Sequence, residues 1–77
     1  MAVFYNSNTG KYEVPAEQGW YIAYRTESGD YDYIKVNREP TSEADAEATL
    51  QCMLWSEESF TELYWDYHIP IYPYTKI

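Results

Sequence analysis

The stretch that decides the fold is GWYIAYRTESGDYDYIKV, residues 19–36 of a chain of 77 residues. Two runs rich in Tyr, Ile and Val, residues 20–26 and 31–37, are typical of β-strands. The polar residues 27–30 separate them, and Gly29 can adopt the positive φ that a tight turn requires. The stretch therefore predicts a β-hairpin at the centre of the fold.

The two faces of this hairpin differ in chemistry, because side chains alternate between the faces of a strand. One face is apolar and is expected to point to the core: Trp20, Ile22, Tyr24, Ile34 and Val36. The opposite face carries a candidate contact face of aromatic and basic residues: Tyr21, Arg25, Tyr31, Tyr33 and Lys35. Sheet-based nucleic-acid binders use such residues, and protein interfaces are also enriched in Tyr and Arg. Alternatively, these tyrosines cover a helix and form the core side.

Shorter β-prone runs precede the hairpin, and a helical segment follows it. Residues 2–5 and 11–14 are separated by the turn residues NSNTG, which predicts a further hairpin. Residues 42–67 form the expected helical acidic segment, which begins with a capping-box-like Ser42 and Asp45.

This segment is compatible with one helix or with two. Ser56-Glu57-Glu58-Ser59 resembles a second N-cap, and the apolar residues that follow have helical spacing: Phe60, Leu63, Tyr64 and Tyr67. Two helices are therefore favoured.

The order of these elements predicts one α+β domain over residues 1–77. An antiparallel sheet of three to four strands, about residues 2–37, is expected to pack against one or two C-terminal helices. Two prolines in residues 69–77 favour an extended C-terminal arm and exclude a helix there. So short a chain buries only a small core, and a large substrate cleft is not expected.

Acidic residues are concentrated in one part of the chain. The sequence has 13 acidic and 5 basic residues, a net charge of −8, and residues 39–66 contain no base. On helices, Glu58, Glu62 and Asp66 would form one row with carboxylates about 6 Å apart. Glu43 and Glu47 would form a second row. Such rows suggest imitation of the phosphates of a nucleic acid, and the alternative is a solvated acidic surface. The candidate partner-binding residues are Glu43, Glu47, Glu57, Glu58, Glu62 and Asp66.

The sequence contains no motif for catalysis, a cofactor or a metal ion, so we expect a protein that is not an enzyme. Cys52 is the only cysteine and is expected to be a buried structural thiol on a helix. His68 is the only histidine and is expected to cap the end of a helix. The chain shows no secretory signal and no long apolar run, which predicts a soluble, cytoplasmic protein that does not bind membranes.

The small, tyrosine-rich and acidic chain, with the pattern of Glu43, Glu47, Glu58, Glu62 and Asp66, resembles phage-encoded inhibitors of bacterial defence. Anti-CRISPR proteins and DNA mimics are the types it resembles most. The resemblance implies that the protein acts in the bacterial host cell and directly inhibits a nucleic-acid-binding effector. A CRISPR effector is one possible partner of this kind. In outline, residues 19–36 and 41–50 are also similar to the arm domains of phage integrases, which are typically basic.

These features favour a non-enzymatic protein-binding inhibitor that blocks the basic nucleic-acid-binding groove of a bacterial defence complex. One alternative is a small DNA- or RNA-binding module that uses the tyrosine and basic face of the hairpin. Another is an accessory subunit that only mediates protein interactions. Abundant surface aromatics are also compatible with a homodimer.

Overall fold

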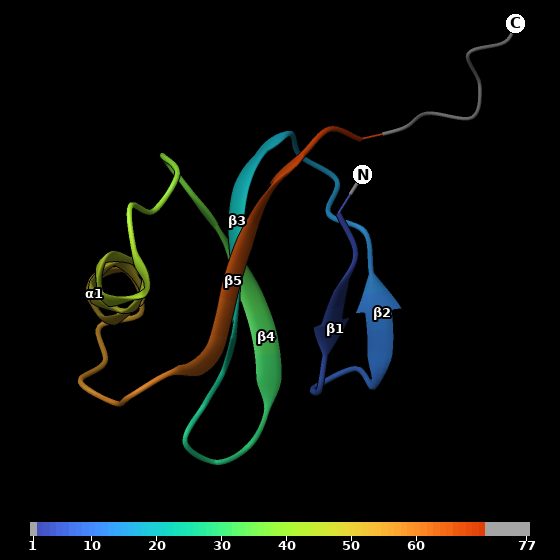
Figure 1. The fold of residues 1–77 in the computed structure, drawn as a ribbon. Coiled ribbons are helices and arrows are strands. Elements are labelled where there is room, and N and C mark those ends of the chain that lie inside the picture. The colour runs from blue at the N-terminus through green and yellow to red at the C-terminus, as the bar shows by residue number, and fades with distance from the viewer. Residues whose placement is uncertain (1, 71–77) are drawn as a thin grey trace, which may run out of the picture.

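The computed structural model describes residues 2–70 and contains a three-stranded sheet, a two-stranded sheet and one helix. The elements follow in the order β1 (Phe4–Asn6), β2 (Lys11–Glu13), β3 (Gly19–Arg25), β4 (Tyr31–Val36), α1 (Glu43–Met53) and β5 (Thr61–His68). Figure 1 shows α1 on one side of the sheet formed by β3, β4 and β5, and the β1–β2 hairpin on the other side. The predicted α+β class is confirmed, although the helix lies in the middle of the chain and a strand follows it.

The central hairpin forms where the sequence predicted it. Strand β3 pairs with β4 in antiparallel register, with Ile22 opposite Ile34. The turn closes through a hydrogen bond from the Thr26 amide to the Asp30 carbonyl at 2.8 Å. Gly29 has a φ of 97°, the left-handed conformation that its lack of a Cβ permits.

The N-terminal runs also form a hairpin, with Phe4 opposite Glu13. It does not extend the central sheet but forms a second sheet of its own, so the larger sheet has three strands with the order β4-β3-β5.

The helix begins as the sequence indicated but is much shorter than residues 42–67. The Asp45 amide donates to the Ser42 side chain at 3.1 Å, which caps the N-terminus. The helix ends at Met53. Its buried residues, Ala46 and Leu50, pack against the sheet.

The prediction of a second helix is wrong, because residues 61–68 form strand β5. This strand pairs antiparallel with the other edge of β3, with Trp65 opposite Ile22. Thr61–His68 alternates between side chains that face α1, such as Leu63 and Trp65, and side chains that do not. It is also rich in Thr, Tyr and Trp, which fit a pleated, half-buried surface. Long-range pairing with β3 thus prevails over the helical spacing.

The two faces of the central sheet pack against different layers. The helix-side core contains buried residues from the sheet, from α1 and from the segment before β5: Ile22, Tyr24, Val36, Ala46, Leu50 and Phe60. The predicted core-facing residues Trp20 and Ile34 are partly buried against it. The hairpin-side core contains Ala2, Phe4, Tyr21 and Ala23, with Tyr33 packed against it.

Ile69 and Pro70 follow β5 without regular secondary structure. The rest of the predicted C-terminal arm, residues 71–77, lies outside the described residues.

Candidate protein-binding surface

The predicted acidic row of Glu58, Glu62 and Asp66 is not formed, because these residues do not lie on a helix. Glu58 lies in the connection between α1 and β5, whereas Glu62 and Asp66 lie on β5 itself. Four residues along a strand span about 13 Å, which is twice the spacing that a helix would give. The phosphate-like spacing expected for Glu58, Glu62 and Asp66 is therefore absent. Glu43 and Glu47 do share α1.

Four of the six candidate carboxylates accept hydrogen bonds within the protein: Glu47, Glu58, Glu62 and Asp66. Glu47 accepts a hydrogen bond from the Phe60 amide at 2.9 Å, which fixes the chain just before β5. Glu58 accepts from the Glu27 amide at 3.2 Å, and Glu27 in return accepts from the Ser59 amide at 3.1 Å. These bonds connect the turn between β3 and β4 to the chain after α1, so Glu47 and Glu58 have structural roles.

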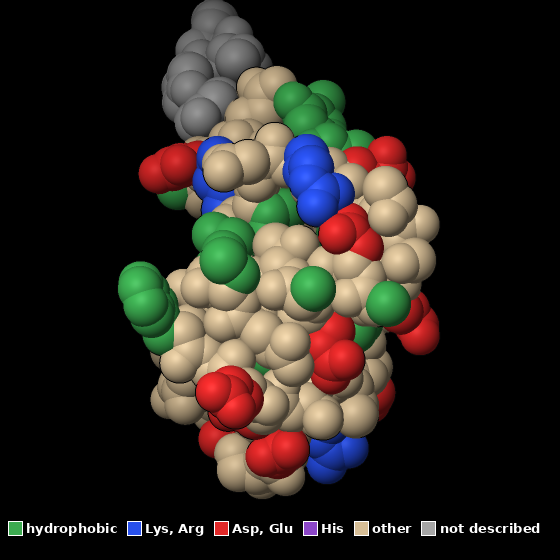
Figure 2. Space-filling view, turned by 90° about the vertical axis from the view of Figure 1, so that its left-hand side faces the viewer, with side chains coloured by type: hydrophobic (Ala, Val, Ile, Leu, Met, Phe, Trp, Pro, Cys, Tyr) green, Lys and Arg blue, Asp and Glu red, His purple; other side chains and the backbone are tan. Residues whose placement is uncertain are grey.

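The side chains of Glu43, Glu57 and Asp66 are exposed. Among the hydrogen bonds of residues 2–70, the carboxylate of Asp66 accepts one from the adjacent Tyr67 amide at 2.8 Å. Figure 2 views the molecule from the helix side and shows Asp and Glu side chains scattered over this face, near its upper edges as well as over its lower part. Lys and Arg side chains lie mainly near its top and at its lower edge. Acidic side chains are therefore distributed over this side and do not form one continuous patch.

The candidate contact face of Tyr21, Arg25, Tyr31, Tyr33 and Lys35 is not an open platform. The N-terminal hairpin covers its centre, so that Tyr21 is only 5% exposed and its hydroxyl donates to the Glu17 carbonyl at 3.0 Å. Tyr33 is half-buried, stacks on Phe4 with ring centroids 5.0 Å apart, and donates to Glu13 at 2.7 Å.

This face is a core side, as the alternative held, but a hairpin covers it in place of a helix. The stacking platform on which the nucleic-acid-binding alternative depended is therefore not exposed as a whole. Lys35 at one end is half-buried, while Arg25 at the other is exposed.

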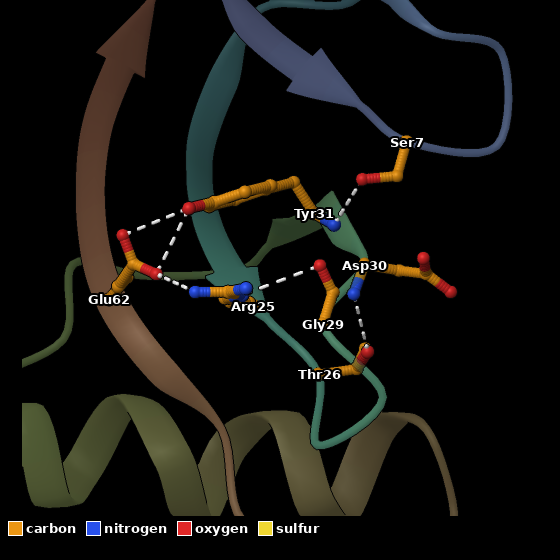
Figure 3. A network of polar contacts seen from close by, with 7 residues as sticks. All are labelled: Ser7, Arg25, Thr26, Gly29, Asp30, Tyr31 and Glu62. Carbon is orange, nitrogen blue, oxygen red and sulfur yellow. Dashed lines mark hydrogen bonds and ion pairs between the residues drawn. The ribbon is translucent and has the colours of Figure 1, made fainter.

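Arg25 belongs to a polar network with Tyr31, across the β3–β4 turn, and with Glu62, which is far away in sequence (Figure 3). Its guanidinium pairs with Glu62 at 3.0 Å, and the Tyr31 hydroxyl lies 3.0 Å from both oxygens of the same carboxylate. The guanidinium carbon also lies 5.3 Å from the centre of the Tyr31 ring, a cation–π contact. Glu62 has a φ of 52° at an irregularity in the pairing of β3 with β5. The irregular backbone of β5 is therefore at the residue whose carboxylate binds Arg25 and Tyr31.

The tyrosine hydroxyls that bond to carboxylates have altered acidities. The hydrogen bond to Glu13 raises the pKa of Tyr33 to about 12, with burial as a second cause. The same bond lowers the pKa of Glu13. The hydrogen bond to Glu62 likewise raises the pKa of Tyr31. Both phenols therefore remain hydrogen-bond donors at neutral pH.

A cleft of about 420 Å³ lies beside this network, between the N-terminal hairpin and the central sheet. Its lining includes five tyrosines and two acidic residues: Tyr5, Tyr12, Tyr24, Tyr31, Tyr64, Asp32 and Glu62. Tyr12 and Tyr64 are 74% and 50% exposed, so their rings are accessible from solvent. Only Tyr31 and Glu62 were among the predicted site residues. The repeated exposed Tyr of β1, β2 and β5 was the available signal, but the sequence does not bring these strands together.

Trp55 is the most exposed large hydrophobic side chain among residues 2–70, at 96% exposure. It follows Leu54, the C-cap of α1, and the amides of Leu54 and Ser56 donate to the carbonyls of Leu50 and Gln51 at 2.9 and 3.0 Å. Trp55 has a φ of 54°, a left-handed conformation that favours glycine. The neighbouring Met53 and Leu54 are also exposed. An apolar tip thus projects from an otherwise acidic segment, and Trp55 is not among the predicted site residues.

The expectations for Cys52 and His68 are both corrected. Cys52 is exposed, because α1 turns its other face to the sheet. His68 ends a strand and not a helix, and it is fully buried. Its Nδ1 accepts from the Ala2 amide at 3.0 Å, and its Nε2 donates to the Pro15 carbonyl at 2.6 Å. These two bonds assign the neutral tautomer and attach β5 to the N-terminal part of the chain.

Within residues 2–70, no three His, Cys, Asp or Glu side chains are grouped so that they could hold a metal ion. The one helix in this range is too short and too polar to cross a membrane. Comparisons with protein-family models, with curated proteins and with solved structures give no match for this chain.

Proposed function

We propose that this protein is a non-enzymatic binding protein that occupies the basic nucleic-acid-binding surface of a partner protein and thereby excludes nucleic acid. The observation that carries the proposal is the exposed Trp55, placed in a segment that contains eight acidic residues and no base between positions 39 and 66. Trp is the residue type most typical of interface hot spots, where it fills a pocket on the partner. The surrounding acids select a partner of positive charge.

The backbone at Trp55 supports a role for this side chain. A non-glycine residue in the left-handed region costs about 1 kcal/mol or more. At 96% exposure the indole gains almost no burial within the protein in return. A binding function that requires the indole at this position accounts for both features, since a glycine would form the same turn with less strain.

The acidic surface supports long-range attraction, although it does not reproduce a row of phosphates. Glu43, Glu57 and Asp66 are exposed, and the net charge of the whole chain is −8. Such a field increases the rate of association with a basic partner and weakens as salt is added. Inhibition of a bacterial defence complex in the host cytoplasm is the specific form of this function that the resemblance implies, and it stays a prediction. A homodimer also stays a prediction.

The proposal is tested by capture and competition. The immobilised full chain and its Trp55→Gly variant are each exposed to a bacterial lysate, and captured proteins are identified and purified. We expect a basic nucleic-acid-binding protein that the wild type retains, that Trp55→Gly loses, and that double-stranded DNA displaces. Retention of the same protein by Trp55→Gly, or simultaneous binding of DNA and this protein by that partner, would contradict the proposal.

A matched pair of charge variants separates local from general electrostatics. Glu43→Gln with Glu57→Gln removes two charges from the acidic segment, and Glu17→Gln with Asp30→Asn removes two from exposed positions elsewhere. Association with the purified partner at low salt is expected to slow several-fold more for the first pair. Equal rates for the two pairs would show that the acidic segment has no special role.

A further inference from the structure

The walls of the tyrosine-lined cleft stand at steep angles to one another. The rings of Tyr5 and Tyr12 lie 5.1 Å apart with an interplanar angle of 63°, and those of Tyr5 and Tyr31 lie 6.1 Å apart at 78°. The ring of Tyr64 contributes to the same cleft from β5. Rings inclined at these angles line the cleft from different sides, so a ligand inside it contacts aromatic side chains in more than one direction. This arrangement is suited to a cation, because the face of each ring carries partial negative charge.

The charge of the cleft favours the same kind of ligand. Among the described residues, the lining contains Glu62 and Asp32 but no Lys or Arg. Asp66 lies close enough to Tyr64 to contribute to the raised pKa of that phenol, after burial and Tyr12. An anionic ligand would meet repulsion here, whereas a cation gains from both the rings and the carboxylates.

The protein already holds one guanidinium in this way at the edge of the cleft. Arg25 pairs with Glu62 at 3.0 Å, and its guanidinium lies 5.3 Å from the Tyr31 ring centre. Arg25 does not itself line the cleft. The contact shows that a Tyr31 ring and the Glu62 carboxylate together suit the planar, delocalised charge of an arginine side chain.

We infer that the cleft binds an arginine side chain of the partner protein. Its volume of about 420 Å³ exceeds what one guanidinium needs and leaves room for the aliphatic part of the side chain and the adjacent backbone. The inference rests on the proposed function only for the statement that the arginine belongs to a partner protein. The recognition of the guanidinium depends only on the cleft.

The experiment uses two tripeptides as probes, acetyl-Gly-Arg-Gly-amide and acetyl-Gly-citrulline-Gly-amide. Citrulline matches arginine in shape but carries no charge. Each is titrated into the full chain, and the aromatic NMR signals of Tyr5, Tyr12, Tyr31 and Tyr64 are followed. We expect saturable shifts of these signals with the arginine probe and binding about fivefold weaker or more with citrulline. Equal affinity for the two probes, or shifts confined to tyrosines outside the cleft, would overturn the inference.

Leucine variants test the contribution of the rings. Tyr12→Leu and Tyr64→Leu retain apolar area but remove a π face, and each is expected to weaken the arginine probe about threefold or more. Tyr67→Leu is the control, since Tyr67 is also exposed on β5 but lies outside the cleft. An equal effect of all three variants would contradict a specific site.

Removal of Arg25 provides a test in the opposite direction. Arg25→Met frees the Glu62 carboxylate and the Tyr31 ring, so the arginine probe is expected to bind several-fold more tightly. Lys35→Met removes the same charge from the far end of β4 and is expected to have a smaller effect. If Arg25→Met fails to exceed Lys35→Met, Glu62 and Tyr31 do not contribute to the cleft as inferred.

These probes keep the inference separate from the proposed function. Capture of a basic partner with no arginine binding in the cleft would reject the inference and leave the proposed function in place. Arginine binding in the cleft without any DNA-competing partner would reject the proposed function alone.

Discussion

The two faces of strand β3 are stabilised in different ways. On the helix side, Ile22 packs among apolar residues of α1 and the neighbouring strands, and Leu50 and Ala46 are completely buried. On the hairpin side, the buried Tyr21 and the half-buried Tyr33 keep polar tips that need partners, and nearby backbone and carboxylate groups supply them. The helix side therefore depends on buried apolar area, and the hairpin side on specific hydrogen bonds.

This difference also locates the open surfaces. On the helix side, α1 packs on the sheet through buried apolar residues, and the binding feature of this side is the tip at Trp55 beyond the helix end. The hairpin is a separate sheet of two three-residue strands and leaves the tyrosine-lined cleft at its junction with the central sheet. A sheet so small has little stability of its own. The hairpin side thus combines a binding cleft with a cover that depends on a few contacts.

Truncation of the helix-side core is expected to have the largest effect. Leu50→Ala leaves a cavity at a residue with no exposure, and we expect the free energy of unfolding to fall by about 3 kcal/mol. Such a loss is a large part of the stability of a domain of this size. Denaturant unfolding measures it. Met53→Ala, at an exposed position of the same helix, is the control and should change stability little. Equal effects would show that α1 does not close the core as described.

The hairpin side should respond strongly to the loss of His68. In His68→Leu the volume is kept, but the Ala2 amide and the Pro15 carbonyl lose their partners, which lowers stability by about 2 kcal/mol. Hydrogen exchange should show faster opening of the β1–β2 hairpin than of β3. Uniform acceleration over both sheets would instead mean that the hairpin and the central sheet unfold as one unit.

The sequence predicted the parts of the fold that depend on neighbours along the chain. The β3–β4 turn at Gly29 and the cap of α1 at Ser42 are local structures with local signals. The segment after Trp55 is different, because its apolar residues fit a helical period at Phe60, Leu63 and Tyr67 as well as a strand period. Only pairing with β3, some 40 residues earlier in the chain, decides between them. Strand composition, with Thr61 and Trp65, is the local signal that favours a strand over a helix here.

The candidate site also combines features that the sequence shows directly with features that depend on the fold. The concentration of acids is a property of the sequence and needs no fold to be recognised. The spacing of Glu58, Glu62 and Asp66 depends on the secondary structure. Because residues 61–68 form strand β5 and not the predicted helix, the predicted row of carboxylates does not form. The cleft depends on contacts between β1, β2 and β5, and Trp55 is distinguished by exposure and backbone conformation. Local sequence patterns give neither the contacts that form the cleft nor the exposure and backbone conformation of Trp55.

High pH should weaken the hairpin side through Tyr33. The pKa of Tyr33 is raised to about 12 from 10.0, so the folded state favours the neutral phenol. The stabilisation of the folded state by this phenol is therefore complete below pH 10 and is lost as the pH rises toward 12. At neutral pH, Tyr33→Phe removes the bond to Glu13 and should lower stability by about 1 kcal/mol. The difference between wild type and Tyr33→Phe should shrink above pH 10, when measured by urea unfolding. A constant difference through this range would contradict the role of the Tyr33 proton.

The smallest expected effect is a gain in stability, at Trp55. Trp55→Gly relieves a left-handed conformation but makes the unfolded chain more flexible, and the net result is expected to be a gain of about 0.5 kcal/mol. Glu62→Gly is the matched variant, since Glu62 also has a positive φ, of 52°, but its carboxylate holds Arg25 and Tyr31. Thermal unfolding should therefore show an increase for Trp55→Gly and none for Glu62→Gly. The contrast follows from what each side chain contacts: the strain at Glu62 is offset within the folded protein, whereas the strain at Trp55 can be offset only by a partner. A loss of stability in Trp55→Gly would mean that the indole serves the fold, and the argument for Trp55 as a binding anchor would fail.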